Sequence, residues 1–235
     1  ERYFSEDFYE KIKNKKKRVV KRTTQALKSA TSIDVPIMYR YQVELGAIHY
    51  YRERGFNAVF SENEPWRMLF GLLFWDIIYD TNVKAIHNPL QRVPSDFFLP
   101  DFYLKRSEQL AERMKMAQTR AQIEDIIIKT YEDKFGITNV LVPWYDDGLQ
   151  KVLTLISWLT PSQIHQILFE MAQNLRENTR GFPDLLVWNE TEYAFIEIKS
   201  PTDHLSSRQL HWQHFFADCG VQSRIVRVQW IKEEL

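Results

Sequence analysis

The segment GFPDLLVWNETEYAFIEIKSPTDHLSSRQ, residues 181–209, is the most informative part of this chain about its fold. Leu185 to Trp188 is a short apolar run typical of a strand, and the polar segment Asn189 to Glu192 is typical of a turn. Tyr193 to Lys199 then alternates in character, which predicts a second strand. The sequence therefore predicts a β-hairpin.

The residues after this hairpin predict a helix and a further strand. Ser206 and Gln209 have the spacing of a capping box, which favours a helix over 206–218. Val221 to Trp230 is apolar enough for a last strand. Two strands, a helix and a strand in this order indicate an α/β fold, with a sheet that is covered by helices.

Two charged side chains lie on one face of the second predicted strand. Glu197 and Lys199 are two positions apart, so both point to the same side. If the turn is centred in the polar segment, Asp184 lies opposite Glu197, with Cβ atoms about 5 Å apart. Two carboxylates at this distance repel each other unless a cation lies between them. Mg²⁺ or Mn²⁺ would suit these oxygen ligands, with the backbone carbonyl of Ile198 as another, and such an ion supports phosphodiester hydrolysis.

An ordinary structural role is the alternative for the same residues. A surface hairpin with a Glu197–Lys199 ion pair would contribute less than ~1 kcal/mol to stability. The spacing Asp-x12-Glu-x-Lys is short enough to occur by chance. Its surroundings favour the chemical interpretation, because Pro183 precedes Asp184 and apolar strands lie on both sides.

The pattern of these residues resembles a known group of nucleases. Asp184 with Glu197 and Lys199 matches the PD-(D/E)xK pattern, and its flanking residues are similar to a VRR-NUC domain. Separate upstream blocks are similar, in the same order, to the Fanconi-anaemia-associated nuclease family, over roughly residues 43–230. The residues that carry the likeness are Gly181, Pro183, Ser200, Pro201, Asp203, Leu205, Ser206 and Gln209, and upstream Ser61-Glu62, Leu69–Ile78, Asn88–Gln91 and Pro94.

The resemblance implies specific roles. It makes Asp184, Glu197 and Lys199 catalytic, and it places Gln91 near the site. Gln209 either supports the site from the helix start or only caps the helix, and both interpretations stay open. The implied metal ligands are Glu62, Asp184, Glu197 and the carbonyl of Ile198.

The resemblance also implies a fold and an activity. It predicts a restriction-endonuclease-like core, a mixed central sheet flanked by helices, with an N-terminal helical extension. The expected activity is that of a 5′-flap endonuclease and 5′→3′ exonuclease in DNA interstrand-crosslink repair, which uses Mg²⁺ or Mn²⁺ and binds flap or branched DNA with a 5′ end. The alternatives are another nuclease of the superfamily, such as a junction resolvase, or a non-catalytic DNA-binding module. An intracellular protein is expected, in the nucleus of a eukaryote or the cytoplasm and nucleoid of a bacterium.

The remaining sequence suggests how the chain is divided. Residues 1–36 are expected to form a basic helical segment at the end of an upstream domain, with a connector at 32–36. Residues 37–235 are expected to form the nuclease domain, with a helical insertion at about 105–178. The upstream DNA-binding and helical-repeat regions of the family are expected to be missing or separate. Phosphate contacts or a merely solvated helix face both fit the basic run Lys15, Lys16, Lys17, Arg18, Lys21 and Arg22.

Composition limits the other possibilities. The 31 basic and 31 acidic residues cancel, so a DNA contact must come from local charge rather than from the total. The single Cys219 excludes an intrachain disulfide and a cysteine-based zinc site. No apolar run approaches the ~20 residues that span a membrane.

Overall fold

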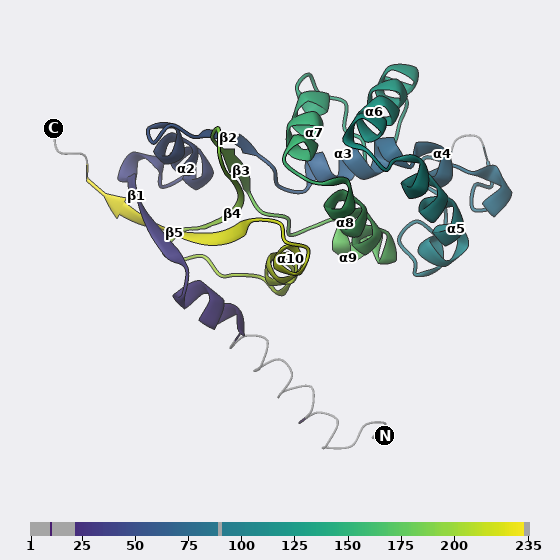
Figure 1. Cartoon of the computed structure of the whole chain (residues 1–235). Helices are drawn as coiled ribbons and strands as arrows, with labels where there is room; N and C mark the ends of the chain where they lie inside the picture. Colours follow the sequence, from purple (N-terminus) through teal and green to yellow (C-terminus); the bar gives the residue numbers. More distant parts are fainter. Residues whose placement is uncertain (1–9, 11–21, 89–90, 233–235) are drawn as a thin grey trace.

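A five-stranded mixed sheet forms the centre of the fold in the computed structural model, which describes residue 10 and residues 22–88 and 91–232 (Figure 1). The strand order is β1-β5-β4-β3-β2. β3 is antiparallel to both β2 and β4, while β5 is parallel to both β4 and β1. This sheet confirms the predicted α/β class. The strands are β1 (Thr31–Pro36), β2 (Asn57–Phe60), β3 (Leu185–Trp188), β4 (Tyr193–Lys199) and β5 (Ser223–Ile231).

Helices cover both faces of this sheet and extend from it as a helical body (Figure 1). α2 and α10 lie on opposite sides of the strands, and α3 to α9 follow β2 and precede β3 in the chain. Residues 22–28, directly before β1, are also helical. The helices are α2 (Val43–Arg52), α3 (Glu64–Leu73), α4 (Trp75–Ile78), α5 (Asp101–Met116), α6 (Arg120–Lys134), α7 (Gly148–Ser157), α8 (Pro161–Gln173), α9 (Leu175–Asn178) and α10 (Ser207–Asp218), with 3-10 turns at Ile37–Tyr39 and Thr81–Val83.

The alternation of β4 separates two apolar cores. Ala194, Ile196 and Ile198 face a small core together with Ala47 and Ile48 of α2. The odd-numbered positions of β4 face the other side. There the ring of Phe195 joins the large core that α10 and the helical body share, whose residues include Trp66, Phe182, Trp212 and Phe216. The predicted facing of β4 is therefore confirmed, and the sheet is buried on both sides.

The predicted connector at residues 32–36 is wrong. Thr31–Pro36 is strand β1, which pairs in parallel with Val226 to Ile231 of β5. Ile33 and Val35 are buried in the α2 core, so burial of two alternating apolar side chains explains the strand. The predicted boundary at residue 36 consequently falls at the end of a strand that belongs to the central sheet.

The spacing of apolar residues predicts a helix over 38–54 and another after Pro65, and both differ in the structure. The first begins only at Val43, after a 3-10 turn, and the second is divided at Phe74 into α3 and α4. Within the expected helical insertion, α7 buries Val152, Leu155 and Ile156 on one of its faces. In the part of the chain that the structure describes, no helix has the length and apolar character needed to cross a membrane.

Candidate active site

The hairpin of β3 and β4 brings Asp184 and Glu197 together. The register pairs Leu185 with Ile196, so the next pair along the ladder is Asp184 with Glu197, as the turn position predicted. Asp184 immediately precedes β3, and its Oδ2 accepts a hydrogen bond of 2.7 Å from the backbone N–H of Ile198. This bond fixes the carboxylate of Asp184 against the C-terminal end of β4.

Glu197 and Lys199 form a close ion pair inside the protein. Lys199 Nζ lies 2.7 Å from Glu197 Oε1. The exposed fractions are 0% for Glu197, 7% for Lys199 and 9% for Asp184, so a weak ion pair on a surface hairpin is the wrong interpretation. Glu197 Oε2 has no hydrogen-bond partner among the described residues. A buried carboxylate oxygen without a partner is costly, and it is suited to binding a cation.

Burial makes both carboxylates hold their protons unusually tightly. Desolvation raises the pKa of Asp184 to about 7, although the N–H of Ile198 and the charge of Lys199 oppose the shift. Desolvation and the neighbouring Asp184 raise the pKa of Glu197 to about 8, again opposed by Lys199. Two carboxyl groups with raised pKa values in one small volume indicate a functional site rather than a structural ion pair.

Glu62 adds a third acidic side chain beside this pair. The preceding Ser61 fastens the end of β2 to the hairpin, since its N–H donates to the carbonyl of Asp184 at 2.8 Å and its Oγ to that of Pro183 at 2.9 Å. Glu62 is exposed, and its charge raises the pKa of both Asp184 and Glu197. Glu44, in the first turn of α2, also raises the pKa of Asp184. The acidic cluster therefore includes Glu62 and Glu44 in addition to the motif residues Asp184 and Glu197.

Gln209 lies near this acidic cluster and also caps α10. A surface pocket of about 370 Å³ is lined by Glu62 and Gln209 together with Arg180 and Arg208. The side chain of Gln209 accepts a hydrogen bond from the N–H of Ser206 at 2.9 Å, and Ser206 Oγ accepts one from the N–H of Gln209. The predicted capping box is thus confirmed, and Gln209 also lines the same pocket as Glu62.

Gln91 lies outside this cluster, contrary to the expectation from the resemblance. Its side-chain amide donates to the carbonyls of Ala85 and Val93 and its Oε1 accepts from the N–H of His87. These three bonds hold together the loop between α4 and α5, on the side of the helical body away from the sheet (Figure 1). The side chain of Gln91 is therefore held by hydrogen bonds to the backbone of its own loop.

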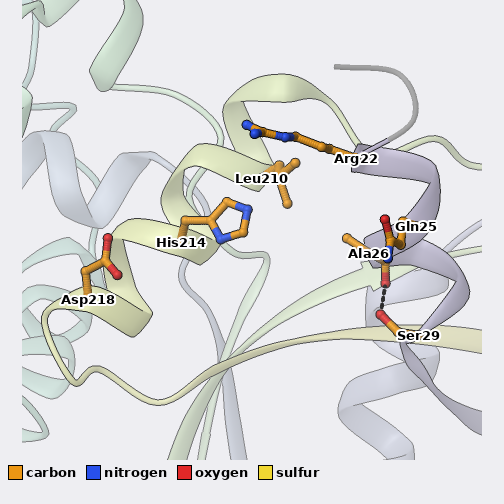
Figure 2. A pocket seen from close by; sticks show the side chains of 7 residues that line it. All are labelled: Arg22, Gln25, Ala26, Ser29, Leu210, His214 and Asp218. Atoms are coloured by element: carbon orange, nitrogen blue, oxygen red, sulfur yellow. Dashed lines mark hydrogen bonds between the residues drawn. The ribbon is translucent and has the colours of Figure 1, made fainter. Parts of the chain in front are cut away.

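The basic residues of the N-terminal segment lie almost entirely outside the described residues. This applies to Lys15, Lys16, Lys17, Arg18 and Lys21. Arg22 is described and exposed, and it lines a groove of about 630 Å³ between the helix of residues 22–28 and α10. Figure 2 shows Arg22 and His214 on opposite walls of that groove.

Gly181 gives the backbone a left-handed conformation three residues before Asp184. Its φ is +81°, and a Cβ there would lie 2.6 Å from Arg208 Cγ and 3.0 Å from the Arg208 carbonyl carbon. We expect Gly181→Ala to cost roughly 1–3 kcal/mol of unfolding free energy and to slow any reaction at Asp184, because the left-handed backbone is strained and the contact with α10 must open. Urea unfolding and initial rates measure both effects.

Gly136→Ala is the matched control for Gly181→Ala. Gly136 has nearly the same φ, +78°, but nothing lies within 4 Å of the position of a new Cβ. Its replacement introduces the backbone strain without the clash, so it should leave the reaction rate unchanged. Equal loss of rate in both variants would contradict the proposed dependence of the site on the contact between Gly181 and α10.

The chemistry of these donors fits a hard divalent cation. Asp184 and Glu197 offer carboxylate oxygens, and the carbonyl of Ile198 lies between Glu197 and Lys199 in the chain. Oxygen ligands of this kind suit Mg²⁺ or Mn²⁺. Among the described residues, no three acidic, histidine or cysteine side chains are gathered closely enough to enclose an ion. A complete ligand shell would therefore need a carbonyl, water, a substrate oxygen or a rotation of the exposed Glu62.

Comparison with known proteins finds the same family in sequence and in structure. Residues 118–230 match the VRR-NUC domain. The chain is 34% identical to a Fanconi-associated nuclease 1 homolog of Caenorhabditis briggsae over 181 residues, which are 73% of this chain and 20% of that protein. It is 28% identical to Fanconi-associated nuclease 1 of Homo sapiens over 193 residues, 79% of this chain and 19% of the relative. The chain thus spans about a fifth of the length of these relatives.

Solved structures share the fold. The crystal structure of paFAN1 bound to 2-nt 5′-flap DNA with a gap is similar with a TM-score of 0.76 and 23% identity, over 88% of this chain and 38% of that one. The structure of paFAN1 with 1-nt 5′-flap DNA with a gap gives a TM-score of 0.76 at 25% identity, over 86% and 37% of the two chains. The predicted arrangement of a mixed sheet flanked by helices is thereby confirmed.

Proposed function

Because this chain belongs to the Fanconi-associated nuclease family and contains its VRR-NUC domain, we propose that it is a divalent-metal-dependent DNA nuclease. The observation that carries the proposal is the buried cluster of Asp184, Glu197 and Lys199. Two carboxyl groups with raised pKa values and an unpartnered Glu197 Oε2 destabilise the fold unless they serve a ligand.

Each residue of the cluster has a distinct role in this proposal. Asp184, Glu197 and the carbonyl of Ile198 would hold Mg²⁺ or Mn²⁺, with Glu62 completing the shell. Such an ion supplies a Lewis acid for the phosphoryl oxygen and lowers the pKa of a water molecule. Lys199 would orient the attacking water or offset the charge that develops on the phosphate. Its ion pair with Glu197 Oε1 already holds the ammonium group beside the carboxylates.

We propose flap or branched DNA with a 5′ end as the substrate. The supporting observations are that relatives are named Fanconi-associated nucleases and that a protein of the same fold was crystallised with 5′-flap DNA. The proposed reactions are 5′-flap endonuclease and 5′→3′ exonuclease cleavage during interstrand-crosslink repair, inside the cell. The basic residues Lys15, Lys16, Lys17, Arg18, Lys21 and Arg22 would add phosphate contacts.

Two other functions fit parts of the same evidence. A junction resolvase of the same superfamily would use the same cluster on a different DNA. A non-catalytic DNA-binding module would not need the three buried side chains, and their common presence therefore favours an enzyme. Gln209 stays a supporting residue of the proposed site, since it lines the pocket next to Glu62.

A panel of DNA substrates tests the proposal. The chain is incubated in Mn²⁺ with 5′-flap, nicked, blunt and four-way DNA of equal length, and binding is measured in parallel in EDTA. We expect the 5′ flap to be cleaved fastest. Preferred cleavage of the four-way junction would indicate a resolvase, and binding without any cleavage would indicate a DNA-binding module.

A further inference from the structure

Arg227 of β5 lies directly beside the lysine of the proposed site. The parallel ladder pairs Lys199 of β4 with Arg227. Paired residues of neighbouring strands point to the same face of a sheet, and the strands lie about 4.8 Å apart. Val226 and Val228, on either side of Arg227, are buried in the α2 core on the opposite face. The side chain of Arg227 therefore leaves the sheet on the same face as Glu197 and Lys199.

The guanidinium group of Arg227 has no partner within the described residues. The side chain is half-buried, yet no carboxylate or carbonyl in residues 22–88 and 91–232 lies within hydrogen-bond or ion-pair distance of it. Each of the other sheltered arginines among the described residues has at least one partner. They are Arg67 on the carbonyl of Thr179, Arg106 on Asp96, Arg113 on Asp76 and Arg208 on Glu177.

A half-buried arginine without a partner suits an anionic ligand. Its five donors form a rigid fork that matches phosphate oxygens, and its charge persists at any physiological pH. Across the sheet, Asp184 lies on the β3 side of β4, Glu197 and Lys199 lie on β4 itself, and Arg227 lies on the β5 side. This order of charges would place a metal at the acidic end and backbone phosphate at the basic end.

We propose that Arg227 binds a backbone phosphate of the DNA strand next to the phosphate that is cleaved. Arg227 is then a positioning residue, since it holds the strand in register with Lys199 and does not contact the reacting bond. The inference rests on the proposed nuclease function, and it adds a contact that the motif residues do not include.

The test compares three variants of the whole chain on 5′-flap DNA. Arg227→Gln should raise KM about tenfold with kcat within about twofold, because a contact made equally before and during reaction is lost. Binding in EDTA should depend less steeply on salt, with the slope of log Kobs against log salt reduced by about 0.7–0.9. Arg227→Lys keeps the charge and should restore the salt slope. Arg224→Gln is the matched control, since it lies on the same strand with its side chain on the opposite face.

The outcomes separate this inference from the proposed function. Wild-type KM and salt slope in Arg227→Gln, or an equal effect in Arg224→Gln, would overturn the role of Arg227 while the enzyme stays active. A lower thermal stability with an unchanged salt slope would mean a structural role and would also overturn it. If the wild-type chain neither cleaves nor binds the flap, the proposed function itself fails, and the variants are not needed to decide this.

Discussion

Asp184→Asn is expected to abolish DNA cleavage and, at the same time, to stabilise the metal-free protein. The substitution removes a proposed metal ligand, so we expect the rate to fall by about 10³-fold or more. Asn retains an oxygen that can accept the 2.7 Å hydrogen bond from Ile198 N–H, so the hairpin should keep its geometry. What disappears is a buried charge that also repels Glu197.

The gain in stability has a defined pH dependence. The pKa of Asp184 rises from 3.8 to about 7 on folding and that of Glu197 from 4.5 to about 8. Between about pH 4 and pH 8 the folded state therefore holds protons that the unfolded chain releases, and the free energy of unfolding falls as pH rises. At pH 8, Asp184→Asn should recover about 2–4 kcal/mol of that loss, while at pH 4 it should change little.

Thermal unfolding in EDTA and in Mg²⁺ or Mn²⁺ measures this prediction. The wild type should be stabilised by the metal at pH 8, because binding to the folded state alone shifts the equilibrium. Asp184→Asn should unfold at a higher temperature than the wild type in EDTA, and should gain little from metal. If the variant is less stable than the wild type in EDTA at pH 8, then burial and mutual repulsion of the two carboxylates do not destabilise the metal-free protein as argued.

Asp96→Ala should destabilise the helical body by about 3–5 kcal/mol. Its partner Arg106 has a fully buried side chain, with Nη1 2.9 Å from Asp96 Oδ2 and Nε donating to the carbonyl of Ile77 at 3.1 Å. The guanidinium also lies 4.4 Å from the ring centre of Phe102. Removal of Asp96 leaves this charge in an apolar interior without its counter-ion, and urea unfolding measures the loss.

Asp101→Ala is the matched control for Asp96→Ala. Asp101 pairs with Lys105 at 3.4 Å, and Lys105 also lies 3.6 Å from Asp96, but Asp101 is largely exposed. An exposed pair of this kind contributes at most ~1 kcal/mol. If both variants lost the same small amount, the buried pair would not stabilise the helical body as argued.

The hairpin and its polar cluster could be predicted from the sequence because their information is local. Strand alternation placed Glu197 and Lys199 on one face, and the polar turn fixed the register that sets Asp184 opposite Glu197. The capping box at Ser206 was equally local, since four consecutive residues define it. Strand alternation does not show that both faces of the sheet are buried. That burial makes the Glu197–Lys199 ion pair an internal one and not a surface one.

The remaining features depend on contacts between distant segments. Ile33 and Val35 form a strand only because β5, almost 200 residues further on, offers a parallel edge. The same parallel pairing places Arg227 next to Lys199, so nothing near Arg227 in the sequence marks it. Gln91 is a different case, because it matches the family pattern and yet its amide is bound by its own loop. The positions of Ile33, Val35 and Arg227, in contrast, follow from tertiary packing.

Cleavage of a 5′-flap DNA by the wild type and by Lys199→Ala in Mn²⁺ decides whether the buried cluster of Asp184, Glu197 and Lys199 is a nuclease site. Lys199 is buried beside Glu197, and its ammonium group is needed for the proposed reaction. The wild type should cut the flap, EDTA should stop the reaction, and Lys199→Ala should lose cleavage while it still binds the DNA. Full activity in Lys199→Ala, or cleavage by the wild type that persists in EDTA, would contradict the assignment of this cluster as a metal-dependent nuclease site.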